Sequence, residues 1–478
     1  MKKYVGYTFV GIASMVAVLS YASIPRTDLT YQKIDFSNAT DLAASTSSLK
    51  EIIEPPAPPV VDTRPVTKHT PLPPQVKAIY MTSCVAGTPS FRERLVKLIN
   101  ETEINSVIID IKDYSGTISF LPENEAWMPA WQNARCGARD MREFVATLHE
   151  QDIFIIGRIT VFQDPFHSER FPHLAVKKLD GNTVWQDGKG LSFIDVAASE
   201  YWDHVVELSV DSYNLGFDEL NYDYVRYPSD GNMRDISFPH TDGSEWSGDK
   251  QANLEAFFAY LNEELDDETK FDAYRHENTG RASTTPWTSA DLFGMTTTNY
   301  DDLSIGQVQD RTAPYFDFVA PMVYPSHYPK NFLGLGNPNS DPYRVVNYAM
   351  STGVKRMMSS TTPMKGFLHE RIGTSTPAVY SKPVYDGTRF RTWIQDFDYG
   401  GNYDIAEVRA QIQASYDAGV MSFMIWAPSN IYTKGALKAP GTYEVETDTQ
   451  EVIKDTIIED PQSTTTSFET VVNEPIPQ

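Results

Sequence analysis

The chain is 478 residues long, and its 41% hydrophobic and 12% aromatic residues suffice for a large buried core. Its formal net charge is −24 and its isoelectric point is near 4.7, with no basic stretch to offset the acidic surface. Such a surface repels the phosphates of DNA and RNA, so we do not expect the protein to bind nucleic acids.

The N-terminal residues predict export. Lys2 and Lys3 precede an uncharged, mostly apolar run over residues 4–22, which is long enough for one helix across a bilayer. A cleavable signal peptide is the alternative, because residues 20–22 resemble a cleavage site. We favour an uncleaved anchor because the apolar run is longer than a usual signal core. Either way, we expect the remaining chain outside the cytoplasm, secreted or held at the cell membrane.

Two segments of biased composition frame the centre of the chain. Residues 23–76 are rich in Ser, Thr and Asp and become proline-dense at 54–59 and 71–74, which predicts an extended linker. Residues 436–478 are acidic and rich in Thr and Ser, with no sustained period, and predict a disordered tail. The domain between them is expected to span residues 77–435.

Within this domain, apolar runs typical of strands alternate with amphipathic patterns typical of helices. The predicted strands are 78–82, 106–112, 154–159, 217–225, 289–295, 317–324, 391–397 and 420–426. The predicted helices are 90–103, with Ser90 as N-cap, 141–150, 200–213, 251–265, 305–315, 343–352 and 405–418. Eight buried strands in this alternation predict a closed parallel (β/α)8 barrel. No GxGxxG motif follows the first strand, which argues against a dinucleotide-binding fold.

The sequence contains two cysteines, Cys84 and Cys136. In an exported protein they either form one disulfide or remain unpaired in a fold that needs no cross-link, and the sequence leaves both outcomes open. The chain has no CxxC, HxH or HExxH spacing, so neither a metal nor a cofactor is expected.

The fourth predicted strand carries the most informative polar residues. Strand alternation places Glu219, Asn221 and Asp223 on one face, and Asp223 stands near the C-terminal end, where barrels of this class bind their substrates. Buried polar groups must be hydrogen-bonded or used for function. The competing interpretation is a purely structural ion network in which Glu219 and Asp223 neutralise Arg158 and Arg226.

Other predicted strands also end in polar or aromatic side chains. These residues are Asp110, Lys112, Arg158, Asp291, Tyr324, His327, Asp396 and Trp426. Asp110 and Lys112 share one strand face and are expected in the same polar layer as Glu219. Hydrolysis of a glycosidic bond needs two carboxyl groups beside that bond, and aromatic faces pack well against sugar rings.

Several motifs resemble those of a bacterial family whose glycoside hydrolase activity is itself inferred, formerly a domain of unknown function distantly related to alpha-amylase-type barrels. The matching motifs are residues 77–82, 107–113, 158–165, 216–228 and 321–328, within a resemblance that covers 77–430. In amylase-like barrels the nucleophile is an aspartate on the fourth strand, the acid lies on the fifth and a supporting aspartate on the seventh. The resemblance therefore implies these roles for Asp223, Asp291 and Asp396. Amylases carry glutamate where this chain has Asp291, so Glu219 and Asp110 remain alternatives for the acid.

We therefore expect a glycoside hydrolase that cleaves an extracellular or cell-envelope polysaccharide, with Asp223 as nucleophile or base and Asp291 as proton donor. The expected substrate-positioning groups are Arg158, Arg226, Tyr324, His327 and Trp426. A non-catalytic glycan-binding barrel displayed on a membrane stalk is the alternative. A metal-dependent hydrolase that uses His167, His173 and His327 is a third possibility, without support from ligand spacing.

Overall fold

The computed structural model describes residues 67–443, except 272–275, 278–280 and 282–283. The predicted apolar segment 4–22, residues 23–66 of the predicted linker and the tail beyond Tyr443 lie outside the described residues. Among the described helices, none has the length and apolar character that a membrane crossing requires.

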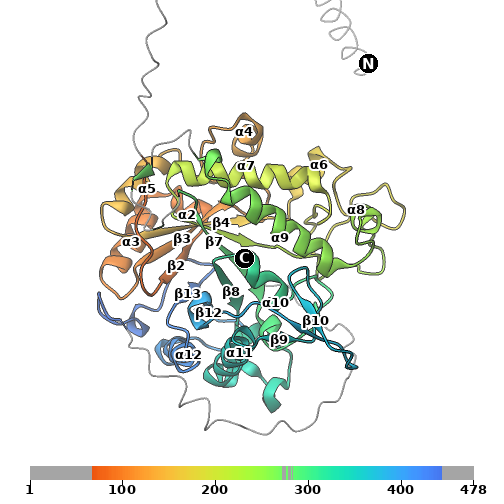
Figure 1. Ribbon diagram of the computed structural model, residues 1–478. Helices are drawn as coiled ribbons and strands as arrows, with labels where there is room; N and C mark the ends of the chain where they lie inside the picture. Colours follow the sequence, from red (N-terminus) through yellow and green to blue (C-terminus); the bar gives the residue numbers. More distant parts are fainter. Residues whose placement is uncertain (1–66, 272–275, 278–280, 282–283, 444–478) are drawn as a thin grey trace, which may run out of the picture. The chain divides into compact units, whose positions relative to one another are not determined.

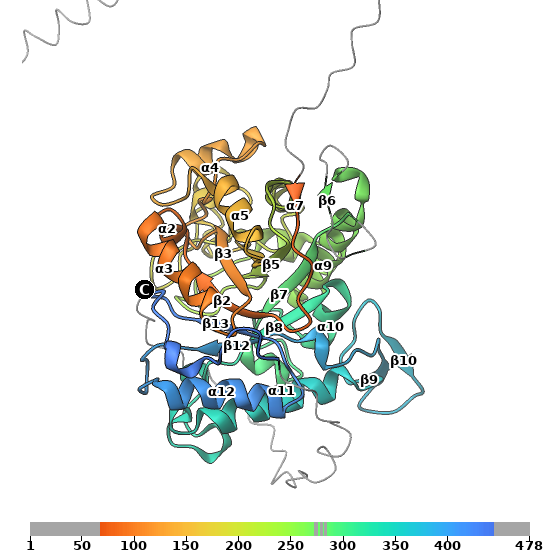
Figure 2. The same ribbon diagram turned by 90° about the vertical axis from the view of Figure 1, so that its left-hand side faces the viewer.

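Eight parallel strands close into a barrel, in the order β12-β13-β2-β3-β4-β5-β7-β8 (Figures 1 and 2). They are β2 (Lys77–Met81), β3 (Ser106–Lys112), β4 (Phe154–Thr160), β5 (Glu219–Asp223), β7 (Trp287–Phe293), β8 (Phe318–Met322), β12 (Thr392–Gln395) and β13 (Phe423–Trp426). Each overlaps one predicted strand, which confirms the (β/α)8 barrel. The fourth strand is shorter than predicted, because Tyr224 adopts a left-handed backbone conformation (φ 53°) directly after Asp223.

Helices pack around the outside of the barrel. They include α3 (Pro89–Asn100), α5 (Met141–His149), α7 (Ser199–Leu215), α9 (Lys250–Asp266), α11 (Pro342–Met357) and α12 (Ile405–Asp417). α11 and α12 lie side by side on one flank, and α3 and α5 on another (Figures 1 and 2).

Two predicted details are wrong. α3 begins at Pro89, because proline suits the first position of a helix, and Thr88 is its N-cap. Ser90, the predicted N-cap, therefore lies inside the helix.

The helix predicted over residues 305–315 is the second error. Only α10 (Gln309–Thr312) and a 3-10 turn (Ala313–Tyr315) form there. Gly306 has a left-handed φ of 85° and Pro314 cannot donate a helical hydrogen bond, so a longer helix is interrupted from both sides.

The folded unit extends beyond the predicted limits of residues 77–435. β1 (Thr67–Lys68) pairs with β6 (His276–Glu277), and the backbone N–H of Thr70 donates to Asp218 Oδ1 at 2.8 Å. At the other end, Lys77 Nζ donates to the carbonyl of Thr442 at 2.6 Å. Residues 67–76 and 436–443 therefore belong to the barrel unit, because these contacts satisfy buried polar groups that composition alone does not reveal.

The loops after β2 and β3 form a cross-linked part of the barrel rim. α2 (Ser83–Ala86) follows β2, and α4 (Met128–Gln132) lies in the long loop after β3. Cys84 and Cys136 form a disulfide that joins the two loops. The pairing that the sequence left open is thus settled by the fold, which brings both cysteines to neighbouring strand ends.

Candidate active site

Four charged side chains from adjacent strands meet inside the barrel near the C-terminal strand ends. Asp110 comes from β3, Arg158 from β4, Asp223 from β5 and Asp291 from β7. Arg158 Nη1 donates to Asp110 Oδ1 at 2.7 Å and Nη2 donates to Asp223 Oδ2, while Nε lies 3.9 Å from Asp291 Oδ2. Three buried carboxyl groups therefore share one guanidinium. One positive charge cannot balance three negative charges in a place of low dielectric.

Asp291 is the carboxyl group of this site whose surroundings most favour the protonated form. Burial raises the pKa of Asp291 well above its usual value, and the neighbouring Asp223 raises it further. The side-chain amide of Asn221 and the indole N–H of Trp393 donate to Asp291 Oδ1 at 2.9 and 2.7 Å. Both of these donors reach Oδ1, whereas Arg158 Nε lies 3.9 Å from Oδ2. A protonated acid in this position can donate to a leaving group.

Asp223 is held by donors on both of its oxygens. Arg158 reaches Oδ2, and the backbone N–H of Tyr224 donates to Oδ1 at 2.5 Å. The left-handed backbone of Tyr224 brings this N–H back toward the carboxylate, and such a conformation is uncommon for a bulky residue. Asp223 is therefore oriented by its own chain as well as by the arginine.

Tyr80 is a site residue that the sequence reasoning missed. Its hydroxyl donates to Asp110 Oδ2 at 2.5 Å, and its ring lies 5.7 Å from the Arg158 guanidinium. Burial raises the pKa of Asp110 to about 6. Alternation in the predicted strand 78–82 places residue 80 toward the interior, so the strand pattern contained the signal.

Aromatic rings line another side of the site. Tyr324, just after β8, lies 5.1 Å from the Trp426 ring at the end of β13, and Phe397 lies 4.9 Å from Trp426. His327 joins the same group at 5.3 Å from Tyr324. Burial lowers the pKa of His327 to about 4, so its imidazole is neutral at pH 7. The predicted residues Tyr324, His327 and Trp426 are therefore brought together.

Glu219 lies away from this centre, at the start of β5. It is fully buried, where it accepts hydrogen bonds from Arg391 and, at 2.6 Å, from Ser289 Oγ. A carboxyl group closed in this way cannot reach a substrate. The structural interpretation of Glu219 is therefore correct, although its partner is Arg391 and not Arg158 or Arg226.

Lys112 also leaves the predicted layer. The register of β3 against β4 shifts between Asp110 and Lys112, so the two side chains do not share a face as predicted. Asp110 faces Arg158, whereas Lys112 Nζ lies 2.9 Å from Asp164 Oδ2 in a separate buried cluster. The expectation that Asp110 and Lys112 form one layer with Glu219 is wrong.

Asp396 and Arg226 lie at the margin. Asp396 accepts hydrogen bonds from the backbone N–H and hydroxyl of Thr433, at 2.8 and 2.7 Å, and so anchors the loop after β13. Arg226 donates to the carbonyl of Tyr227 at 3.0 Å and packs over the Tyr224 ring. Neither contacts Asp223 or Asp291 by a hydrogen bond or ion pair among the described residues.

The histidines considered as metal ligands are dispersed. His167 is bound to Asp164 at 2.8 Å, and His173 lies 3.4 Å from Glu200 on the surface. In the part of the chain that the structure describes, no three His, Cys, Asp or Glu side chains are arranged to hold a metal ion.

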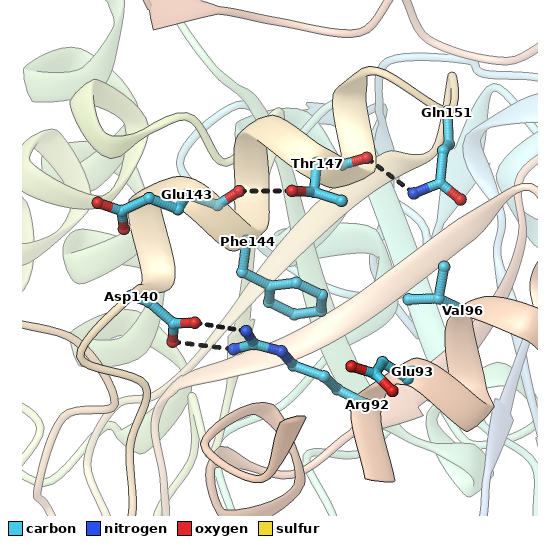
Figure 3. A pocket seen from close by; sticks show the side chains of 8 residues that line it. All are labelled: Arg92, Glu93, Val96, Asp140, Glu143, Phe144, Thr147 and Gln151. Carbon is cyan, nitrogen blue, oxygen red and sulfur yellow. Dashed lines mark hydrogen bonds and ion pairs between the residues drawn. The ribbon is translucent and has the colours of Figure 1, made fainter. Parts of the chain in front are cut away.

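A crevice of about 360 Å³ between α3 and α5 also contains carboxylates (Figure 3). Its Asp140 is bound by Arg92, whose guanidinium lies over the Phe144 ring. The crevice runs along the outer wall of the barrel and receives no side chain from a strand. It therefore does not compete with the interior site as an active site.

Comparisons with known proteins find a matching family and several similar solved structures. A family described as a "putative glycosyl hydrolase domain" matches residues 78–432. The chain is similar to the glycoside hydrolase domain of PgaB (BpsB) from Bordetella bronchiseptica, at 12% identity and TM-score 0.47, covering 76% of this chain and 94% of that one. It is also similar to the beta-amylase catalytic domain from Paenibacillus polymyxa, at 10% identity and TM-score 0.43, covering 80% and 98%. A hypothetical protein from Ruminiclostridium thermocellum is 28% identical, covering 42% and 95%, at TM-score 0.34. No curated protein matches the chain.

Proposed function

Since the chain belongs to this family of glycosyl hydrolase domains, we propose that it hydrolyses glycosidic bonds of a polysaccharide outside the cytoplasm by carboxylate acid–base chemistry. The observation that carries the proposal is the pair Asp223 and Asp291, two carboxyl groups in contact with one guanidinium. Burial and the neighbouring Asp223 raise the pKa of Asp291, which suits Asp291 to the role of the acid.

The strand register supports a direct partnership between the two aspartates. Tyr222 of β5 pairs with Ala290 of β7, so Asp223 and Asp291 follow at the same level. Adjacent strands lie about 4.8 Å apart. Asp291 protonates the leaving oxygen, and Asp223 acts on the anomeric carbon, as nucleophile or through a water molecule. Arg158 holds Asp223 and Asp110 in place for this step.

The aromatic group of Tyr324, Phe397 and Trp426 supports a sugar as the ligand. Aromatic faces pack against the apolar faces of sugar rings, while polar rim groups bind hydroxyls. Trp426 is only half buried, so part of its ring is available to a ligand. Tyr324 and Phe397 follow β8 and β12, and Trp426 ends β13. In the closed order of strands, β8 and β12 lie across the barrel from β3 and β4, which carry Asp110 and Arg158.

The decisive experiment replaces Asp223. The full-length wild-type chain and Asp223→Asn are assayed for reducing ends released from a panel of neutral, amino and acidic polysaccharides. We expect the variant to lose about 100- to 10,000-fold in kcat, because the base is gone while the fold is kept. Asp152→Asn, on an exposed turn between α5 and β4, is the matched control.

Equal turnover by Asp223→Asn and the wild type would refute the assignment. If the wild type binds a polysaccharide and cleaves none, the glycan-binding alternative is supported instead.

The disulfide supports a location outside the cytoplasm, because such bonds persist in oxidising compartments. The apolar segment predicted at 4–22 supports the same location. In a bacterial host, deletion of residues 2–22 is expected to leave the barrel in the cytoplasm with free thiols, measured by fractionation and thiol labelling. Export without this segment would contradict the proposal.

A further inference from the structure

A second hollow lies on the barrel rim, between the loops that follow β2 and β3. Its volume is about 720 Å³, within the roughly 300–1,000 Å³ of known ligand pockets. The residues that give it its chemical character are Leu121, Trp131, Gln132, Arg135 and Arg139. We call this hollow the rim groove. α2 belongs to the loop after β2 and α4 to the loop after β3, and the disulfide between Cys84 and Cys136 joins these two loops.

The walls of the rim groove are fixed relative to each other. The disulfide between Cys84 and Cys136 crosses from one wall to the other. A Cβ at Gly137 would lie 2.6 Å from the Trp131 ring, and one at Gly87 would lie 2.3 Å from the carbonyl oxygen of Gly137. Both positions therefore require glycine, and the close packing holds the half-buried Trp131 in place. A preorganised groove loses little entropy when a ligand binds.

The charge of the rim groove is opposite to that of the whole chain. The chain has a formal net charge of −24, yet no Asp or Glu lines this groove. Arg135 and Arg139 are exposed there, and neither forms an ion pair with another described residue. The nearby Asp140 is already bound by Arg92. Two unpaired guanidinium groups beside an indole ring are suited to a ligand with anionic groups and apolar ring faces.

The rim groove is close to the proposed active site. Cys84 is four residues after Tyr80, and four residues span at most about 14 Å of extended chain. Ser83 Oγ donates to Asp113 Oδ2 at 3.2 Å, which ties the start of α2 to the end of the strand that carries Asp110. A polysaccharide cleaved at Asp223 and Asp291 can thus extend a few sugar units along the rim into the groove.

We propose that the rim groove binds anionic groups of the polysaccharide, through Arg135 and Arg139, while Trp131 packs against a sugar ring. The proposal rests on the proposed function and specifies its substrate class, an acidic glycan. The anionic group is a carboxylate of a uronic acid or the phosphate of a phosphodiester-linked glycan, which present the same chemistry to arginine.

The test measures binding by the full-length chain carrying Asp223→Asn, so that no polymer is cleaved. The probes are polygalacturonate, a glycerol-phosphate teichoic acid and neutral dextran, in calorimetry at low salt. We expect one acidic polymer to bind and dextran to bind at least 10-fold more weakly. Adding Arg135→Gln and Arg139→Gln is expected to lower the affinity for the acidic polymer at least 10-fold. Adding Trp131→Ala is expected to lower this affinity further.

The matched control is Arg94→Gln with Arg344→Gln, which removes the same charge from exposed helix positions outside the groove. We expect this control to change affinity less than 2-fold. The preferred acidic polymer distinguishes carboxylate from phosphate recognition. Failure of both acidic polymers to bind, equally tight binding of dextran, or an equal loss in the control pair would overturn the proposal.

The outcome is separable from that of the proposed function. Asp223-dependent cleavage of neutral glycans alone would uphold hydrolysis and overturn the acidic-glycan inference. Arginine-dependent binding of an acidic polymer, with no cleavage by the wild type of any polysaccharide in the panel, would uphold the groove and refute hydrolysis.

Discussion

At the scale of single residues, the proposed site depends on one aspartic acid whose pKa is raised. Burial and the neighbouring Asp223 raise the pKa of Asp291, so the protonated form persists to higher pH than in a free aspartic acid and is lost as pH rises through the raised pKa. We expect kcat to fall on this alkaline side. Asp291→Asn should lower kcat about 100- to 10,000-fold and abolish the alkaline limb of the pH profile. If kcat of the variant still falls on the alkaline side as in the wild type, another group is the proton donor.

Asp211 offers a residue-scale prediction about stability. It lies in α7, where its carboxylate accepts the backbone N–H groups of Glu123 and Asn124. Burial raises its pKa to about 6, so the folded state binds the proton more tightly than the unfolded chain. Stability is therefore lost as pH rises from about 4 to 6. One pKa unit corresponds to about 1.4 kcal/mol.

Asp211→Asn keeps the acceptor oxygen and removes the buried charge. We expect the free energy of unfolding to rise by about 1–3 kcal/mol at pH 7.5 and the gain to disappear near pH 4. Urea unfolding at both pH values measures the effect, with Asp152→Asn as control. A variant less stable than the wild type at pH 7.5 would contradict this interpretation.

At the scale of elements, the inward face of β5 has three separate tasks. Glu219 forms an ion pair with Arg391 beside β12, Asn221 donates to Asp291, and Asp223 belongs to the reacting pair. The period-2 pattern of the strand puts all three inside the barrel. Their different roles follow from the neighbouring strands, each of which contributes a different partner at each level.

Glu219→Gln is the corresponding test. It leaves the Arg391 guanidinium buried without a counter-charge, which is expected to lower the free energy of unfolding by about 3–5 kcal/mol. Glu219→Leu combined with Arg391→Met should recover most of that loss. The pH profile of kcat should keep its shape in the glutamine variant, because Glu219 does not take part in the chemistry. A shifted profile would return Glu219 to the catalytic candidates.

At the scale of the whole molecule, one covalent cross-link constrains the chain. The disulfide between Cys84 and Cys136 closes a loop with a sequence separation of 52 residues. Loop-closure entropy for that length corresponds to about 4 kcal/mol of stabilisation. The double variant Cys84→Ala with Cys136→Ala should therefore unfold at a lower denaturant concentration. Its free energy of unfolding should be lower than that of the wild type by about 4 kcal/mol. Added reductant should shift the wild type to the same midpoint and leave the double variant unchanged.

The sequence by itself determined the barrel and the inward face of β5. Eight apolar runs with helical patterns between them admit few other folds, and alternation predicted that Asp223 shares one strand face with Glu219 and Asn221. The alternation also contained Tyr80, but nothing local distinguishes a site tyrosine from a core tyrosine. Residues 67–76 were predicted to belong to the linker, because amino-acid composition does not reveal the long-range hydrogen bonds that these residues form.

Only the tertiary structure decided which charges meet. A one-residue register shift in β3 separates Lys112 from Asp110, and the closed strand order brings Arg391 to Glu219 and Arg158 to three carboxyl groups. The same closure brings Cys84 and Cys136 together and forms the rim groove. The physical reason is that side-chain direction is a local property of the backbone, whereas pairing depends on the register and order of strands distant in sequence.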